Sequence, residues 1–286
     1  SAPVSSSNSS PTFTTSPSYT VSGTVSDLSG IKSVTVNGEE ATLDGTNWSY
    51  SLALAANTTT TVTVIATDNV GTTSTVTRYV HYDNSAPSLT VSSPSSTSLV
   101  YTTSSSYTIS GTASDLSGVK SVTVNGQAAS LSGNNWSYNL GLAANNTTTV
   151  TIVATDNVGR TTTQTRYLFY DSANPTLSVT APSGNISVTS SSYTVRGTAS
   201  DASGIASVTV NGTSVGLSSG SFSRAITLST GNNTITVVAK DKAGRTTTIT
   251  RTITYSAYKV ISSTSGSGLG FTPNFIVLGH TGKGTG

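Results

Sequence analysis

The stretch Asp27-Leu-Ser-Gly-Ile-Lys-Ser-Val-Thr-Val-Asn-Gly38 decides the fold, because it occurs three times in the chain. It returns as Asp115-Leu-Ser-Gly-Val-Lys-Ser-Val-Thr-Val-Asn-Gly126 and as Asp201-Ala-Ser-Gly-Ile-Ala-Ser-Val-Thr-Val-Asn-Gly212. Each copy joins a turn sequence, a short alternating apolar run and an Asn-Gly turn, which together are typical of β structure. Internal repetition fixes the architecture before any single residue is considered. The chain therefore consists of three copies of one β-rich unit.

The composition of the 286-residue chain favours folded β domains. Ser and Thr exceed a third of all residues, but Thr alternates with Val, Ile, Leu and Tyr, as in half-buried strands. The net charge of +2, with no cluster of Lys and Arg, predicts no nucleic-acid partner. The absence of cysteine excludes disulfides and thiolate metal sites, and no apolar run is long enough to span a membrane. Since the chain begins with Ser1 and lacks a signal peptide, we interpret it as a mature product or an excised piece.

Turn residues recur roughly every eight to twelve positions, which predicts about seven strands in each copy. That strand number, in roughly 85 residues, is typical of an immunoglobulin-like sandwich. We therefore predict an all-β fold: three tandem immunoglobulin-like β-sandwiches forming a rod, plus a Gly/Ser-rich C-terminal tail with one extra strand. In the second copy, alternation predicts these inward-facing residues: Tyr107, Ile109, Val122, Val124, Trp136, Tyr138, Leu140, Leu142, Val150, Ile152, Ala154, Leu168 and Tyr170.

The repeat boundaries define four segments. Residues 1–84, 85–172 and 173–256 are the three repeats, and residues 257–286 are a tail or the start of another module. The linkers Tyr82-Asp-Asn-Ser-Ala-Pro87 and Tyr170-Asp-Ser-Ala-Asn-Pro175 are short and contain proline, so we expect them to be stiff. Ser1-Ala-Pro3 matches only the end of a first strand, so we expect the first repeat to lack that strand and to present an open edge.

One pattern resembles a known family. It reads Pro-x-Leu-x-Val, then Tyr-Thr-Val-x-Gly-Thr-x-Ser-Asp, Ser-Val-Thr-Val-Asn-Gly, Asn-x-x-Thr-Val-x-Ala-x-Asp-x-x-Gly and Tyr, and it covers nearly residues 1–256. It resembles bacterial immunoglobulin-like repeats, especially those of the glucodextranase B-domain type. Such repeats occur in bacterial surface proteins and adhesins, beside catalytic domains of polysaccharide-degrading enzymes, and in phage fibres. The resemblance implies the fold and an extracellular setting, but no particular activity.

The tail contains the apolar stretch Phe271-Thr-Pro-Asn-Phe-Ile-Val-Leu278, which resembles the first strand of a repeat. Two interpretations fit it. The chain is a window of a longer protein whose next module starts near Lys259, or the tail completes the first repeat of a second copy by strand donation, which would build an open fibre. In the second interpretation the donated residues are Phe271, Phe275, Ile276, Val277 and Leu278. The same stretch is similar to segments of phage tail-fibre proteins.

The residues that usually perform catalysis are scarce in this chain. It has two histidines, of which His280 lies in the tail and His81 alternates with inward-facing neighbours, so we expect His81 to face solvent. No histidine is placed near a recurring aspartate, and no nucleophile–base pair is evident. The sequence therefore predicts that the protein is not an enzyme.

Recurring aspartates are the strongest candidate site. In a sandwich of this type, two loops of one repeat and the preceding linker meet at the same pole, which brings three aspartates together. One interpretation is that these aspartates are turn residues whose carboxylates accept local backbone N–H bonds. The other is that each group binds a structural Ca²⁺ ion, and no other cofactor is expected. The two groups are Asp83, Asp115 and Asp156, and Asp171, Asp201 and Asp241.

These observations predict a non-catalytic structural or spacer module of a bacterial or phage surface protein or fibre, located outside the cell. The expected partners are neighbouring copies of the chain or other surface and fibre proteins. Two alternatives remain open: an adhesive or carbohydrate-binding module that contacts cell-surface glycans, and accessory modules of a polysaccharide-degrading enzyme.

Overall fold

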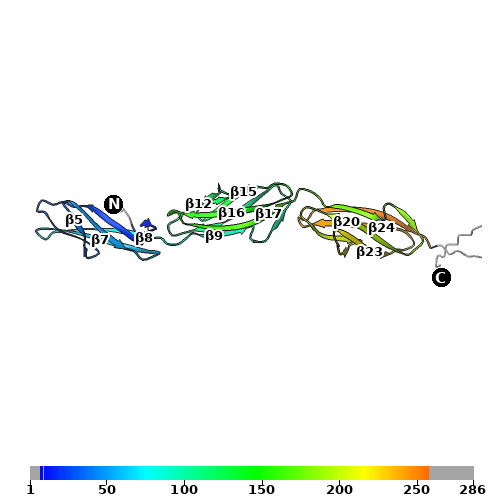
Figure 1. Ribbon diagram of the computed structural model, residues 1–286, viewed down its shortest axis with the longest axis horizontal. Coiled ribbons are helices and arrows are strands. Elements are labelled where there is room, and N and C mark those ends of the chain that lie inside the picture. The colour runs from blue at the N-terminus through cyan, green and yellow to red at the C-terminus, as the bar shows by residue number, and fades with distance from the viewer. Residues whose placement is uncertain (1–6, 9, 258–286) are drawn as a thin grey trace, which may run out of the picture. The chain divides into compact units, whose positions relative to one another are not determined.

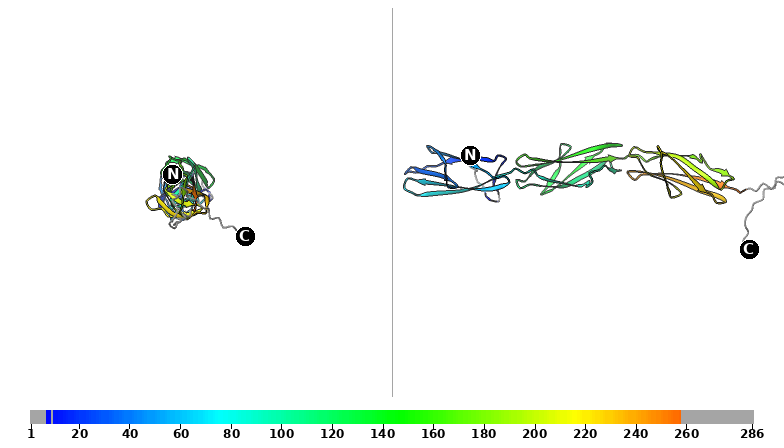
Figure 2. Two further views of the ribbon diagram at one scale, coloured as in Figure 1. Left: turned by 90° about the vertical axis from the view of Figure 1, so that its right-hand side faces the viewer. Right: turned by 60° about the horizontal axis from the view of Figure 1, so that its bottom comes forward.

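The structure is a computed structural model that describes residues 7, 8 and 10–257. These residues form strands and turns without any helix, as the views from different sides show (Figures 1 and 2). A membrane-spanning helix is therefore absent from the described part of the chain. The chain divides into two compact units, with the first repeat and part of the second in one, and the rest of the second repeat and the third in the other.

The first repeat contains a five-stranded sheet in the order β1-β8-β7-β3-β4 and a three-stranded sheet in the order β2-β6-β5. Apolar residues of both sheets form one core cluster, as in a sandwich. The strands are β1 (Thr12–Thr14), β2 (Ser18–Thr24), β3 (Ile31–Val36), β4 (Glu39–Glu40), β5 (Thr42–Asp44), β6 (Asn47–Ala53), β7 (Thr58–Asp68) and β8 (Thr73–Tyr82).

The second repeat has a five-stranded sheet in the order β10-β17-β16-β12-β13 and a four-stranded sheet in the order β14-β15-β11-β9. Most residues predicted to face inward are buried, and Ile109, Val150 and Leu168 are completely buried. Four of them are only half-buried: Tyr107, Tyr138, Leu140 and Tyr170. The strands are β9 (Ser88–Ser93), β10 (Val100–Thr102), β11 (Ser106–Ser114), β12 (Val119–Val124), β13 (Gln127–Ala128), β14 (Ser130–Ser132), β15 (Asn135–Gly141), β16 (Asn146–Asp156) and β17 (Thr161–Tyr170).

The third repeat has a five-stranded sheet in the order β19-β25-β24-β21-β22 and a three-stranded sheet in the order β18-β20-β23. Its strands are β18 (Thr176–Ala181), β19 (Ile186–Val188), β20 (Ser192–Ser200), β21 (Ile205–Val210), β22 (Thr213–Val215), β23 (Ser221–Thr227), β24 (Gly231–Asp241) and β25 (Thr246–Tyr255). The prediction of an all-β chain of three immunoglobulin-like sandwiches is thus confirmed.

The Asn-Gly end of each repeated block is a strand-pairing turn. In the second repeat, Asn125 and Gly126 have φ angles of 49° and 79°, the left-handed conformation that a two-residue hairpin requires. The Asn125 side chain also accepts a hydrogen bond from the backbone N–H of Thr151, 2.8 Å away on the neighbouring strand. The turn therefore joins β12 to β13 and ties it to β16.

A glycine faces the large aromatic residue of each core. A Cβ atom added to Gly111 would lie 2.0 Å from the carbonyl oxygen of Thr90 in β9 and 2.9 Å from Cζ2 of Trp136. At Gly23 in the first repeat, the three nearest atoms all belong to the Trp48 ring, the closest at 3.0 Å. The difference arises because β9 pairs with β11 over this position, whereas β2 has only β6 as a neighbour among the described residues.

The expectation that His81 faces solvent is wrong. The imidazole is 2% exposed, its Nδ1 lies 2.9 Å from Thr59 Oγ1, and the Phe13 ring lies 5.4 Å away between centroids. The cause is the short strand β1, which pairs in parallel with β8 and sets Phe13 beside His81. Alternation along β8 alone gives no sign of this neighbour.

The four segment boundaries, the missing first strand and the rod remain predictions. The tail residues Phe271, Phe275, Ile276, Val277, Leu278 and His280 lie outside the described residues.

Candidate metal centres

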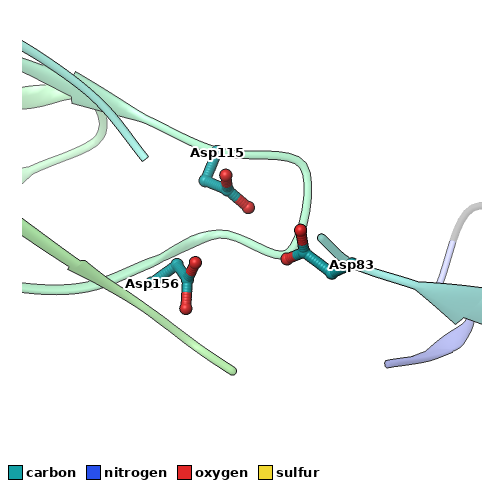
Figure 3. Close-up of side chains that lie close together, drawn as sticks. All are labelled: Asp83, Asp115 and Asp156. Atoms are coloured by element: carbon teal, nitrogen blue, oxygen red, sulfur yellow. The ribbon is translucent and has the colours of Figure 1, made fainter. Parts of the chain in front are cut away.

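The first aspartate group, which we call triad 1, consists of Asp83, Asp115 and Asp156. Asp83 directly follows β8, Asp115 lies in the turn between β11 and β12, and Asp156 ends β16. Each residue offers a carboxylate oxygen, and these oxygens all lie within 4.8 Å of one another. Figure 3 shows the three carboxylates pointing toward a shared space from three separate segments. All three residues belong to the same compact unit.

One oxygen of each carboxylate in triad 1 holds a local turn. Asp115 Oδ1 accepts hydrogen bonds from the backbone N–H and the hydroxyl of Ser117, at 2.8 and 2.7 Å. Asp156 Oδ1 accepts from the N–H groups of Val158 and Arg160, at 2.9 and 2.8 Å, and Asp83 Oδ1 accepts from the N–H of Ser85 at 3.0 Å. Oδ1 of each aspartate thus makes the local hydrogen bonds that the turn interpretation expects.

The second oxygen has a different environment. Oδ2 of Asp83 and Oδ2 of Asp156 are buried without a hydrogen-bond partner, and the two residues are 2% and 0% exposed. A buried polar group without a partner costs about 1–3 kcal/mol, and a charged one costs more. The turn interpretation accounts for Oδ1 but leaves Oδ2 unexplained.

Triad 2, formed by Asp171, Asp201 and Asp241, repeats this arrangement within the other compact unit. Its residues follow β17, follow β20 and end β24, and their ligand oxygens again lie within 4.8 Å of one another. Oδ1 of Asp201 accepts from the N–H and hydroxyl of Ser203, both at 2.7 Å. Oδ2 of Asp171 and of Asp241 is buried without a partner, as in triad 1. The structure therefore brings together both predicted groups.

The charges in each triad require compensation. At an effective dielectric constant of about 20, two carboxylates separated by 4–5 Å repel each other by about 3–4 kcal/mol. Burial adds to this cost, because it removes the water that would stabilise the ionised form. A hard cation bound to the three oxygens would remove both penalties.

An arginine that the sequence did not single out holds the linker beside triad 1. Arg160 Nε donates to the carbonyl oxygen of Asp83 at 3.1 Å, and Arg160 Nη2 donates to Asn84 Oδ1 at 2.7 Å. On the other side, the N–H of Asp83 donates to the Thr14 carbonyl at 2.9 Å, and the N–H of Asn84 donates to Asn57 Oδ1 at 2.7 Å. The linker is thus bound to both repeats that it joins.

Arg245 plays the same part beside triad 2. Its Nε and Nη2 donate to the Asp171 carbonyl at 3.2 and 3.0 Å, and Nη2 also donates to the Thr103 carbonyl at 3.3 Å. The N–H of Asp171 donates to the Thr102 carbonyl at 2.9 Å. A signal was present in the sequence: arginine follows the Asp-x-x-Gly turn only in the second and third copies, and Thr72 occupies this position in the first.

One surface pocket recurs in all three repeats. In each repeat one pocket lies beside the glycine and the large aromatic residue of the core, at Gly23 and Trp48 in the first repeat and Gly111 and Trp136 in the second. The third repeat has the equivalent pocket at Gly197 and Phe222. Because the pocket recurs with the fold and is lined mainly by Ser, Thr and Gly, it reflects the shared sandwich geometry.

Solved structures with a similar arrangement of strands include bacterial proteins. Fibronectin(III)-like modules of CbhA from Clostridium thermocellum are 20% identical, with 58% of this chain and 93% of that chain covered and a TM-score of 0.38. The Escherichia coli adhesin FdeC is 15% identical, with 85% and 93% covered and a TM-score of 0.42. The protein SGBP-B of the Bacteroides ovatus mixed-linkage glucan utilization locus, solved with a heptasaccharide, is 13% identical, with 89% and 68% covered and a TM-score of 0.22.

Sequence comparison identifies the family. No curated protein matches the chain. The family of glucodextranase, domain B, matches three successive segments, residues 4–84, 87–171 and 175–257. These segments contain all the described strands and both triads, so the resemblance seen in the sequence is confirmed. The chain belongs to the glucodextranase domain B family, of which it carries three consecutive members.

Proposed function

We propose that the chain is a non-catalytic structural spacer of an extracellular protein, on a bacterial surface or in a surface or phage fibre. The observation that carries this proposal is the anchoring of both linkers. Asp83 and Asp171 are each buried, and each has its backbone carbonyl bound by an arginine of the following repeat. A linker that is bound on both sides is stiffer than a flexible coil. A spacer requires this stiffness, because it must hold its ends apart.

Membership of the family also favours a non-catalytic role, because domain B of glucodextranase is an accessory domain. We expect no enzymatic activity from these repeats. The bond between Thr59 and His81 joins a hydroxyl to an imidazole, but His81 is 2% exposed and lies beside the Phe13 ring, so a substrate has no access to it. We assign that pair a structural role.

Small-angle X-ray scattering tests the spacer function. The full chain is compared with a variant that carries an insertion of about ten Gly and Ser residues between Tyr82 and Asp83, which separates the first repeat from the Asp83 carbonyl that Arg160 binds. A spacer predicts a narrow distribution of end-to-end distances for the native chain and a broad one for the insertion variant. Equally broad distributions would contradict the proposal.

The alternative functions predict different results. A carbohydrate-binding module, or accessory modules that direct an enzyme to its polysaccharide, would bind glycans on an array or sediment with an insoluble polysaccharide. The recurring pocket offers hydroxyl groups and an aromatic edge, but Trp48 and Trp136 are 8% and 2% exposed, which leaves little ring face for stacking on a sugar. We therefore favour the spacer.

A fibre-forming spacer is a second candidate, and the edge of β2 favours it. Within the described residues, no strand covers β2 and Gly23 where β9 covers Gly111 in the second repeat. We propose that residues 271–278 of a second copy pair with this edge, so that copies join head to tail. Deleting residues 271–278 should abolish fibres seen by negative-stain microscopy. Fibres that persist without these residues, or a purified chain that stays monomeric, would contradict strand donation.

A further inference from the structure

We propose that triad 1 and triad 2 are two Ca²⁺ sites, and that each ion fastens a linker to the repeat that follows it. The two oxygens of each of these buried carboxylates have different partners. Oδ1 of Asp156 is saturated by two turn N–H groups, while its Oδ2 is buried without a partner. The same holds for Oδ2 of Asp83, Asp171 and Asp241. Each triad therefore contains two unpartnered buried oxygens.

The two arginines beside the triads donate to neutral oxygens instead of to the carboxylates. At triad 1, the Arg160 guanidinium donates to the Asp83 carbonyl oxygen and to the Asn84 amide oxygen. Arg245 likewise donates to the carbonyls of Asp171 and Thr103. Both guanidinium groups are thus bonded to neutral oxygens, and the unpartnered Oδ2 atoms remain available to a metal ion.

The donor set selects the kind of cation. All the side-chain donors are carboxylate oxygens, and each triad lacks the histidine and cysteine ligands that zinc prefers. Ca²⁺ accepts six to eight oxygen ligands in flexible geometry, whereas Mg²⁺ requires a near-ideal octahedron and keeps much of its water. Three carboxylates on three separate segments, completed by backbone carbonyls or water, therefore suit Ca²⁺ better.

The positions of the three aspartates predict the structural effect of Ca²⁺ binding. Two ligands of triad 1, Asp115 and Asp156, lie in loops of the second repeat, while Asp83 lies at the end of the first. An ion held by all three cross-links the linker to the second repeat at the point where Arg160 already binds it. The first repeat has equivalent turns at Asp27 and Asp68, but no third aspartate is grouped with them among the described residues. The expected stoichiometry is two ions per chain.

Calorimetric titration of the chelator-treated full chain with CaCl₂ tests the proposal. Native protein should bind two ions, with affinities in the range of about 10⁻⁴–10⁻³ M that is usual for extracellular calcium modules. Asp83→Asn and Asp171→Asn should each remove one ion, because asparagine retains a side-chain oxygen for the turn but loses the charge. Asp27→Asn is the matched control, since it alters the same type of turn outside a triad and should leave two ions bound.

The contrary results are equally distinct. Failure of the native chain to bind Ca²⁺ at 10 mM or so would overturn the proposal. So would equal affinity for Mg²⁺, or loss of an ion in Asp27→Asn. Far-ultraviolet circular dichroism of each variant verifies that it is folded. The proposal does not depend on the spacer function: absence of binding leaves the scattering comparison intact, and a flexible chain can still bind two ions.

Discussion

The first and second repeats contain the same two aspartate turns in different surroundings. Asp27 and Asp68 hold their turns through Oδ1, as Asp115 and Asp156 do. Asp27 is nevertheless exposed, and Asp68 is only half-buried, whereas Asp156 is completely buried. The comparison shows that the turn is a property of the local sequence. The triad is a property of two adjacent repeats, because its third member comes from the linker.

The second difference concerns strand β9, which covers the recurring core glycine in the second repeat but has no counterpart over Gly23 among the described residues. It gives the largest expected effect. Gly111→Ala would place a methyl group 2.0 Å from the Thr90 carbonyl, so β9 must move, at a cost of about 3 kcal/mol or more. Gly23→Ala meets only the Trp48 ring and should change the free energy of unfolding by less than about 1 kcal/mol.

The two tryptophans allow the stability of the first and second repeats to be measured separately in each variant. Trp48 lies in the first repeat and Trp136 in the second, so two indole N–H signals in an NMR spectrum follow the unfolding of each repeat in urea. Equal losses of stability in the two variants would show that β9 does not make the difference between these repeats.

Removal of calcium should affect the repeats unequally. With Ca²⁺ at about 100 times its dissociation constant, binding stabilises a repeat by about 2.7 kcal/mol. Chelation should therefore lower the free energy of unfolding reported by Trp136 by about that amount and leave the value reported by Trp48 nearly unchanged. A parallel decrease at both tryptophans would indicate an effect on the whole chain instead of on the triads.

The arginine contacts give a smaller effect. Arg160→Ala removes two hydrogen bonds to the linker, each worth about 0.5–1.5 kcal/mol. Amide hydrogen exchange at Asn84 and Ser85 should accelerate by roughly tenfold, which corresponds to about 1.4 kcal/mol. Thr72→Ala is the control, because it alters the equivalent position in the first repeat and should leave that exchange rate unchanged.

The smallest expected effect concerns pH. Hydrogen bonds from the Ser29 hydroxyl and backbone N–H lower the pKa of Asp27 below its ordinary value of 3.8. Because the folded pKa is below the unfolded one, these bonds stabilise the turn at pH values above the unfolded pKa. Their contribution is lost as pH falls through the folded pKa. The NMR chemical shift of the Asp27 carboxyl carbon should titrate with a midpoint below pH 3.8. Ser29→Ala should raise this midpoint, because it removes the hydroxyl hydrogen bond. An unchanged midpoint in Ser29→Ala would show that this hydrogen bond does not lower the pKa of Asp27.

The sequence predicted those features that depend on local pattern or on repetition. Alternation identified inward residues such as Ile109 and Val150, and the repeated turns placed Asp115 and Asp156 at one pole. The grouping with Asp83 followed from the order of the chain, since the linker must reach that pole. Local sequence, repeat spacing and connectivity were sufficient for these features.

What the sequence could not predict depends on neighbours far apart in the chain. His81 is buried because Phe13 in β1 lies beside it, and a three-residue strand gives too weak a signal to reveal that pairing. The bonds from Arg160 to Asp83 and Asn84 join residues 77 and 76 positions apart. The separate environments of the two Asp156 oxygens also require coordinates, because turn sequence accounts for only one of them.

The parallel pairing of the short strands with the last strand of each repeat has a mechanical consequence. Strand β10 pairs in parallel with β17, and β19 pairs in the same way with β25. In each pair the second strand is the one through which the chain leaves the repeat. Tension along β17 or β25 would pull that strand lengthwise past β10 or β19, so that all the backbone hydrogen bonds between the two strands bear the force at the same time. If the strands were instead pulled apart from one end, these hydrogen bonds would break one after another. The backbone hydrogen bonds between these parallel strands therefore give each repeat a resistance to stretching that does not require a bound ion.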